Sequence, residues 1–256
     1  MMTENTKRRS VYIKMKAETV LYETDAQKDF MDRRGALFIR NNQEPTPWPY
    51  GAELILPNMY ELHKYALGQK WRIAGSCDRH FEEDVELKRN NGAFIDHCMN
   101  GTWGQLRLEG LWPQRDIYIR SKDGPMLGQR IYTEDELRLY AETNRQLIFE
   151  KQSYDVATNP NFKHTMRLLF DRGMKRLVFD GVATDYCVKA AVLASAKFRD
   201  QFGVDLELYV VKDAIEAVGI DFEGKVNPGF TQQALDEMQK VGTKFVTTAD
   251  VLEGRI

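Results

Sequence analysis

The sequence predicts a three-layer α/β/α fold built on a mainly parallel sheet. Two observations predict it: runs rich in β-branched and apolar residues alternate with segments of helical spacing, and glycines or polar residues separate them. Strands that alternate with helices form parallel sheets whose two faces are both covered. A chain of 256 residues, 43% of them hydrophobic, suits one large core. We therefore expect residues 19–256 to form a single domain, preceded by a polar N-terminal extension over residues 1–18.

The first half of the chain predicts two strands and one helix, followed by a long irregular stretch. Alternating apolar residues indicate the strands, and apolar residues at helical spacing indicate the helix. The expected elements are a strand over 19–24 ending at Asp25, a helix over 51–67 with Gly68 as its C-cap, and a strand over 71–76 ending at Cys77 and Asp78. Glycine, asparagine and proline break any periodicity over residues 81–114. A loop this long in a compact domain is usually functional.

The second half predicts strands and helices in alternation. The expected elements are a strand over 116–120, a helix over 134–145 that reads as an insertion, an extended segment over 146–150, a helix over 160–172 closed by Gly173, a strand over 176–180, a helix over 186–199, a strand over 206–211, a helix over 231–240 and a strand over 244–246. No G-x-G-x-x-G follows any of these strands, so a dinucleotide-binding site is excluded.

Composition narrows the class of protein. The net charge is −2 and the pI is about 6.2, which leaves no positive excess for nucleic acid. The basic cluster Lys7, Arg8 and Arg9 reads as a solvated tail. No apolar run approaches the roughly 20 residues of a membrane span. Three cysteines, an odd number, indicate reduced thiols and a cytoplasmic protein.

Four polar positions fall where predicted strands end. Asp25, Asp78 and Lys151 each follow a strand, and the segment that leads to Cys187 follows another. The carboxyl ends of parallel strands share one edge, which is where ligands bind in open α/β sheets. Cys187 also lies near the start of a predicted helix, where the helix dipole favours a thiolate, and a nearby lysine would act in the same direction. The alternative is a buried, inert cysteine.

The residues around Cys187 carry a resemblance. Residues 181–188, which run Gly-Val-Ala-Thr-Asp-Tyr-Cys-Val, resemble the nucleophile motif of the isochorismatase-like cysteine hydrolases, and of the nicotinamidases in particular. The segment that begins at Asp25 resembles the family's first motif, and Lys151 is similar to its catalytic lysine. The resemblance implies that Cys187 is the nucleophile, Asp25 the general base and Lys151 the catalytic cation. Lys122, which also follows a strand, is the alternative lysine.

A second part of the resemblance concerns a metal ion. Asp78 and His80 resemble the aspartate-x-histidine pair with which nicotinamidases hold a divalent metal, and the segment that begins at His97 resembles the one that supplies another histidine. One carboxylate and two imidazoles suit zinc, with iron and manganese as alternatives. The family often has a further histidine about six residues after the aspartate. Asp84 stands there instead, so either it replaces that imidazole as a ligand or the position is empty.

The resemblance also implies a pocket and an oxyanion hole. Phe30 and Phe94 occupy places where nicotinamidases hold the pyridine ring between aromatic side chains, although either can serve the core instead. The backbone N–H groups of Ala183 and Cys187 are the expected oxyanion donors. Family members often have a cis peptide bond in this turn, which corresponds here to the bond between Val182 and Ala183.

The implied activity is hydrolysis of nicotinamide to nicotinic acid and ammonia through a thioester. Two alternatives remain open: an amidase of the same superfamily that acts on a carbamoyl or ureido compound, and a catalytically silent relative that binds a ligand. An isochorismate-type hydrolase is disfavoured, because such relatives typically lack the cysteine. The expected partner is a small amide rather than nucleic acid or membrane, and the resemblance implies a homo-oligomer.

Overall fold

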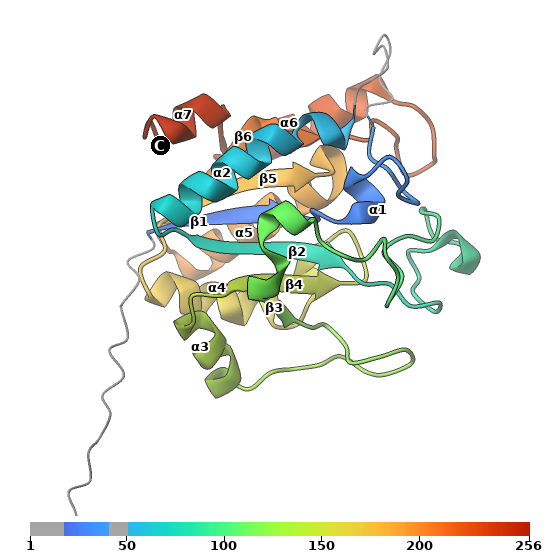
Figure 1. Ribbon diagram of the computed structural model, residues 1–256, viewed down its shortest axis with the longest axis horizontal. Helices are drawn as coiled ribbons and strands as arrows, with labels where there is room; N and C mark the ends of the chain where they lie inside the picture. The colour runs from blue at the N-terminus through green and yellow to red at the C-terminus, as the bar shows by residue number, and fades with distance from the viewer. Residues whose placement is uncertain (1–17, 41–50) are drawn as a thin grey trace, which may run out of the picture.

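The computed structural model describes residues 18–40 and 51–256, and Figure 1 shows a central sheet between two layers of helices. Within these residues seven parallel strands form one sheet in the order β3-β4-β2-β1-β5-β6-β7. The strands are β1 (Thr19–Thr24), β2 (Arg72–Asp78), β3 (Asp116–Ile119), β4 (Gln146–Lys151), β5 (Arg176–Val182), β6 (Glu207–Glu216) and β7 (Lys244–Val246). The predicted fold is confirmed. The basic cluster Lys7, Arg8 and Arg9 lies outside the described residues.

Helices cover both faces of the sheet. α2 and α7 pack on one face, whereas α3, α4 and α5 pack on the other (Figure 1). The α-helices are α1 (Lys28–Met31), α2 (Leu56–Gly68), α3 (Glu134–Glu142), α4 (Phe162–Asp171), α5 (Lys189–Phe202), α6 (Pro228–Lys240) and α7 (Thr248–Leu252). Short 3₁₀ turns and one π-helical turn lie in the connections: η1 (Ala52–Leu54), η2 (Lys88–Asn90), η3 (Glu109–Leu111), η4 (Pro113–Arg115), η5 (Val156–Thr158) and the π turn η6 (Thr184–Val188). In the part of the chain described, none of the helices combines the length and apolar character needed to cross a bilayer.

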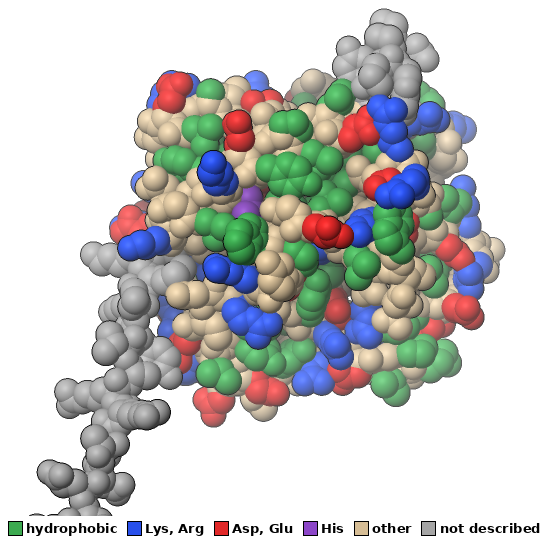
Figure 2. All heavy atoms as spheres, viewed as in Figure 1, with side chains coloured by type: hydrophobic (Ala, Val, Ile, Leu, Met, Phe, Trp, Pro, Cys, Tyr) green, Lys and Arg blue, Asp and Glu red, His purple; other side chains and the backbone are tan. Residues whose placement is uncertain are grey.

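Two apolar layers hold the helices on the sheet, and β1 contributes to both. Tyr22 faces the layer under α3, α4 and α5, where its ring centroid lies 5.2 Å from that of Phe179. Leu21 points to the opposite face and joins Met59 and Leu62 of α2. Successive side chains of a strand alternate between faces, so a central strand covered on both sides is buried along its whole length. On the molecular face shown in Figure 2, acidic and basic side chains are interspersed.

The predicted helix over 51–67 is shorter than expected. Its first residues form η1, and α2 then begins with Pro57 in its first turn. Proline has no N–H to donate, and its fixed φ suits the first helical turn, so the helix starts there. The prediction of Gly68 as the C-cap is wrong: Gly68 is the last residue of α2, and the left-handed residue is Lys70 with φ 58°.

Other boundaries also differ from the predictions. β6 continues to Glu216, beyond the predicted strand over 206–211. The short helices α1 and α7 are not predicted, although a capping box formed by Thr247 and Asp250 marks the start of α7. The predicted helix over 186–199 begins as the π turn η6 and becomes α-helical only at α5.

Arg107 fixes the long loop over residues 81–114 to the sheet. Its guanidinium is fully buried and donates to Glu23 of β1 at 2.6 Å and to Asp116 of β3 at 2.7 Å. Glu23 also contacts His63 of α2 at 2.5 Å, and Gln146 of β4 accepts a further Arg107 bond at 3.1 Å. If the loop moved away, Arg107 and its carboxylate partners would be left as uncompensated buried charges. Because that is energetically costly, this network holds the loop in one position.

We predict that Arg107→Met lowers the free energy of unfolding by about 3–5 kcal/mol, because two buried carboxylates lose their cation. Urea unfolding followed by circular dichroism measures the change. Arg138→Met is the matched control, since Arg138 pairs with Glu134 on the exposed face of α3 and should unfold like the parent protein. Equal stability of the two variants would contradict the proposed anchoring role of Arg107.

Candidate active site

The polar residues that follow the predicted strands converge at one edge of the sheet. Asp78 and Lys151 are direct partners in the pairing of β2 with β4. Asp25 follows Thr24, which pairs with Gly181 of β5. The turn η6, which carries Cys187, follows β5 directly. The predicted convergence is therefore observed, and it results from the register of four adjacent parallel strands.

Lys151 is the centre of this cluster. Its ammonium is fully buried and lies 2.9 Å from Asp25 Oδ2 and 3.6 Å from Cys187 Sγ. It also donates to Asp78 Oδ1. Asp25, Asp78 and Cys187 each bring a carboxylate oxygen or the sulfur to within 4.8 Å of the other two. Ser76 Oγ donates to the other Asp25 oxygen at 2.8 Å, so the carboxylate is held in place from both sides.

Charge inside this cluster is set by burial and by the lysine. Burial raises the pKa of the Asp25 carboxyl above its ordinary value, and the Lys151 ammonium only partly opposes this. Burial alone would also raise the pKa of Asp78, but Lys151 and the two nearby histidines hold it well below its usual range. Burial works against a charged Lys151, yet the two carboxylates keep its pKa well above the ordinary value. Lys151 is therefore a permanent cation.

The expectation of an easily formed thiolate at Cys187 is wrong for the free protein. Burial raises the pKa of the Cys187 thiol well above its ordinary value, Lys151 offsets only part of the rise, and Asp25 adds to it. Desolvation outweighs the neighbouring cation because the sulfur lies almost out of reach of solvent. The thiol consequently keeps its proton, and a base must remove that proton when the sulfur reacts.

The turn before Cys187 has the shape that the sequence predicts. Gly181 adopts φ +101°, and any Cβ there would collide with the carbonyl oxygen of Thr24 on β1. The peptide bond between Val182 and Ala183 is cis, as expected. The neighbouring Asp185 accepts hydrogen bonds from the N–H groups of residues 218 and 219 at 3.1 and 2.7 Å. These bonds tie the nucleophile turn to a loop that forms one wall of the cavity.

Asp78, His80 and His97 form a second cluster, and its donor set fits a divalent metal. One ligand atom from each residue lies within 4.8 Å of the others, and all three side chains are buried. Asp78 Oδ2 lies 3.8 Å from His80 Nε2 and 3.5 Å from His97 Nε2. His80 Nε2 has no hydrogen-bond partner within the described residues. A buried orphan imidazole nitrogen beside a carboxylate is typical of a ligand set for zinc.

Asp84 is not at the position of a metal ligand, and Lys122 is not at the position of the catalytic lysine. Asp84 does not join the three ligand atoms; its Oδ2 lies 3.2 Å from the outer nitrogen of His80. Lys122 Nζ donates to Asp84 Oδ1 at 2.8 Å, so this lysine pairs with Asp84 and not with Cys187. The geometry thus leaves Lys151 as the lysine beside the sulfur.

Glu86 is a candidate that the sequence analysis misses. It faces the cavity, and its Oε2 is buried without a hydrogen-bond partner within residues 18–40 and 51–256. Burial raises the pKa of Glu86 to about 7, and the charge of Asp78 adds to the rise. Several acidic residues stand close together in this loop, and only the fold reveals which of them turns inward.

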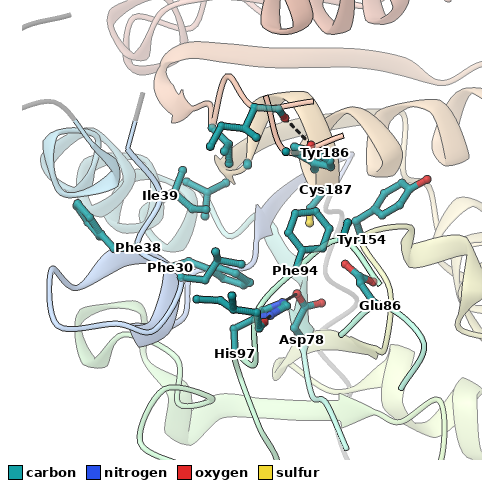
Figure 3. Close-up of a pocket in the computed structure, with 18 of the residues that line it drawn as sticks. Phe30, Phe38, Ile39, Asp78, Glu86, Phe94, His97, Tyr154, Tyr186 and Cys187 are labelled. Carbon is teal, nitrogen blue, oxygen red and sulfur yellow. Dashed lines mark hydrogen bonds and ion pairs between the residues drawn. The ribbon is translucent and has the colours of Figure 1, made fainter. Parts of the chain in front are cut away.

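A cavity of about 350 Å³ opens in front of both clusters. Figure 3 shows Phe30, Phe94, His97, Asp78 and Cys187 around the same opening. The ring centroids of Phe30 and Phe94 lie 5.4 and 6.0 Å from that of His97. The wall is completed by Val182 and Ala183 of the predicted cis peptide bond and by residues that the sequence does not single out, among them Phe38, Ile39, Tyr154, Tyr186, Val218 and Ile220. An aromatic, largely apolar cavity thus ends at a thiol.

Comparison with known proteins finds one matching domain and several similar structures. Residues 130–250, which include Lys151 and Cys187, match the isochorismatase domain. Among solved structures, the pyrazinamidase of Pyrococcus horikoshii in complex with zinc is 23% identical, with 90% of this chain and 99% of that chain covered and a TM-score of 0.60. The nicotinamidase/pyrazinamidase of Acinetobacter baumanii is 17% identical over 92% and 98% of the two chains, with a TM-score of 0.61.

A third similar structure is an amidase with another named substrate. The N-carbamoylsarcosine amidase of Thermoplasma acidophilum is 16% identical over 90% of this chain and 96% of that chain, with a TM-score of 0.56. No curated protein matches the sequence. At these identities the structural likeness establishes the fold. The matched domain and the shared fold make the chain similar to the isochorismatase-like hydrolases, and pyrazinamidases and nicotinamidases are among its structural neighbours.

Proposed function

We propose that the chain is a cysteine amidohydrolase that converts nicotinamide to nicotinic acid and ammonia. The observation that carries the proposal is the Lys151 ammonium, which contacts both the Asp25 carboxylate and the Cys187 sulfur at the end of an aromatic cavity. A thiol beside a base and a fixed cation has what nucleophilic catalysis requires. Similar structures named pyrazinamidase and nicotinamidase support an aromatic amide as the substrate.

In the first half of the reaction Asp25 takes the thiol proton while the Cys187 sulfur attacks the carboxamide carbon. The oxyanion that forms accepts hydrogen bonds from the backbone N–H groups of Ala183 and Cys187, and each such donor contributes about 3 kcal/mol to lowering the barrier. The C–N bond then breaks. Ammonia leaves with the proton that Asp25 received, and the acyl group remains on the sulfur as a thioester.

In the second half Asp25 removes a proton from water, and the resulting hydroxide attacks the thioester carbon. The C–S bond breaks, the acid is released, and Asp25 returns a proton to the sulfur. Lys151 keeps its charge throughout, because two buried carboxylates hold its pKa well above the ordinary value. It therefore stabilises whichever neighbour, carboxylate or sulfur, carries the negative charge.

Aromatic side chains and a metal would position the substrate ring. Phe30 and Phe94 line the cavity and would contact the faces of the ring, and such stacking contributes about 1 kcal/mol per pair beyond burial. Asp78, His80 and His97 would hold a divalent metal, for which we propose zinc, and the metal would supply a Lewis acid for the ring nitrogen. Glu86 faces the same opening and is a candidate further ligand.

Hydrolysis of a carbamoyl or ureido amide is the second candidate function. The structural likeness to an N-carbamoylsarcosine amidase favours it, and the same base, cation and thiol would serve. The two candidates differ in the use of the metal cluster, because a carbamoyl compound has no ring nitrogen to bind. A ligand-binding protein without activity is a weaker proposal, since Asp25, Lys151 and Cys187 are all present and in contact.

We predict that Cys187→Ala abolishes ammonia release from nicotinamide and leaves the fold unchanged. The variant loses the sulfur that forms the thioester, and the cavity only widens. Coupled ammonia detection measures the activity, and circular dichroism checks the fold. Cys77→Ala, a buried cysteine of β2 outside the cavity, is the control and should remain active. Full activity of Cys187→Ala would exclude the sulfur as nucleophile.

The acid limb of the pH profile should belong to Asp25. Asp25 must be ionised to act as a base, and burial raises its pKa above the ordinary 3.8. We therefore expect kcat/KM to rise with pH and to fall as the pH drops through that raised pKa. Glu86 is a second carboxyl group at the cavity, and burial raises its pKa to about 7. Glu86→Gln should keep the limb; its disappearance in that variant would assign the limb to Glu86.

Removal of the metal should greatly weaken nicotinamide turnover. Dialysis against a chelator leaves Asp25, Lys151 and Cys187 in place but removes the group that would orient the ring. Steady-state rates before dialysis, after it, and after addition of zinc measure the effect. Undiminished turnover after complete metal removal would favour a metal-independent amidase.

A further inference from the structure

We propose that Asp84 is a positioning residue that orients His80 for metal binding, and that Lys122 holds Asp84 in this role. The inference rests on the proposed metal site of Asp78, His80 and His97. It assigns a function to two residues that belong neither to the catalytic group around Cys187 nor to the set of metal ligands. It also explains why an acidic residue close to the cluster does not enter it.

The contact between Asp84 and His80 has the geometry of an outer support. His80 is fully buried, and its Nδ1 lies 3.2 Å from Asp84 Oδ2. The same oxygen accepts the N–H of Phe81 at 2.9 Å, which fixes the carboxylate in the turn over residues 81–84. A carboxylate at one ring nitrogen keeps the proton on that nitrogen. Nε2, which lies 3.8 Å from Asp78 Oδ2, is then the nitrogen that can give its lone pair to a metal.

His97 has the same arrangement with a different partner. Its Nδ1 contacts the carbonyl oxygen of Ile95 at 2.7 Å, and its Nε2 faces Asp78 Oδ2 at 3.5 Å. Both rings are thus held at the outer nitrogen, and both present the inner nitrogen to the same carboxylate oxygen. A carboxylate makes the ring a more basic ligand than a backbone carbonyl does, so the support from Asp84 should contribute more to affinity.

Lys122 prevents Asp84 from turning inward. Its ammonium donates to Asp84 Oδ1 at 2.8 Å and to Glu83 Oε1 at 3.0 Å, and it lies 4.5 Å from the centroid of the Phe81 ring. Glu83 in turn accepts the N–H of Met126 at 2.6 Å. The segment after β3 therefore packs against the turn that carries Asp84. One Asp84 oxygen is engaged by the lysine, which leaves the other for His80.

The test measures zinc binding by the metal-free protein, without any amide substrate. Titration against a chromophoric chelator gives the zinc Kd of the parent protein and of Asp84→Asn. Loss of a carboxylate that supports a ligating histidine typically weakens metal affinity about 10–100-fold, and we expect a change of that size. Glu82→Gln is the matched control: it removes the same charge two residues away, from an exposed side chain with no contact to His80. Its zinc affinity should equal that of the parent.

A second measurement does not depend on how the variant folds. The chain has four histidines, so ring signals of the zinc-loaded parent protein can be assigned by nitrogen-15 NMR. We expect zinc on Nε2 of His80 and a slowly exchanging proton on Nδ1. Zinc bound through Nδ1 of His80, or equal zinc affinity of Asp84→Asn and the parent, would overturn the role of Asp84. A parent protein that binds no zinc would instead refute the metal site on which the inference depends.

Discussion

The Lys151 ammonium has no access to solvent and lies between two carboxylates and a sulfur. Burial of a charge costs several kcal/mol unless partners compensate for it, and here Asp25 and Asp78 both do so. Asp78 also faces the two histidines of the metal cluster. A single lysine therefore links the nucleophile to the metal cluster, and neither group can change its charge without affecting the other.

The position of this lysine depends on the sheet. The strands that end at Asp78, Asp25, Lys151 and the nucleophile turn are β2, β1, β4 and β5, and they are adjacent in the order β4-β2-β1-β5. Their parallel registers bring Asp78 and Lys151, and the segments that carry Asp25 and Cys187, to the same edge of the sheet. The cavity wall, in contrast, comes from loops that Arg107 and Asp185 fix to this frame. Groups that react are held on rigid elements, and groups that select a ligand are held on loops.

This division explains which features the sequence could predict. Asp25, Lys151 and Cys187 could be expected at one sheet edge because each lies at or after the end of a strand, and strand ends are visible in the hydrophobic pattern. Their roles came from the resemblance carried by residues 25–30, 149–154 and 181–188. The inward turn of Glu86 and the outward turn of Asp84 could not be found, since side-chain direction in a loop follows no period. The hydrophobic pattern also could not predict the raised pKa of Cys187. A helix start and a nearby lysine indicate a thiolate, but the burial that raises the pKa depends on the whole fold.

Asp84 and Lys122 are a further case in which the sequence could not predict where a loop side chain points. Their chemistry suggests a metal ligand and a catalytic cation, and the sequence places both near the site. In the structure the two side chains pair with each other. The Lys122 ammonium donates to the Asp84 carboxylate, which would otherwise be free to turn toward a metal. The charges near the reacting sulfur are thus fewer than the sequence suggests.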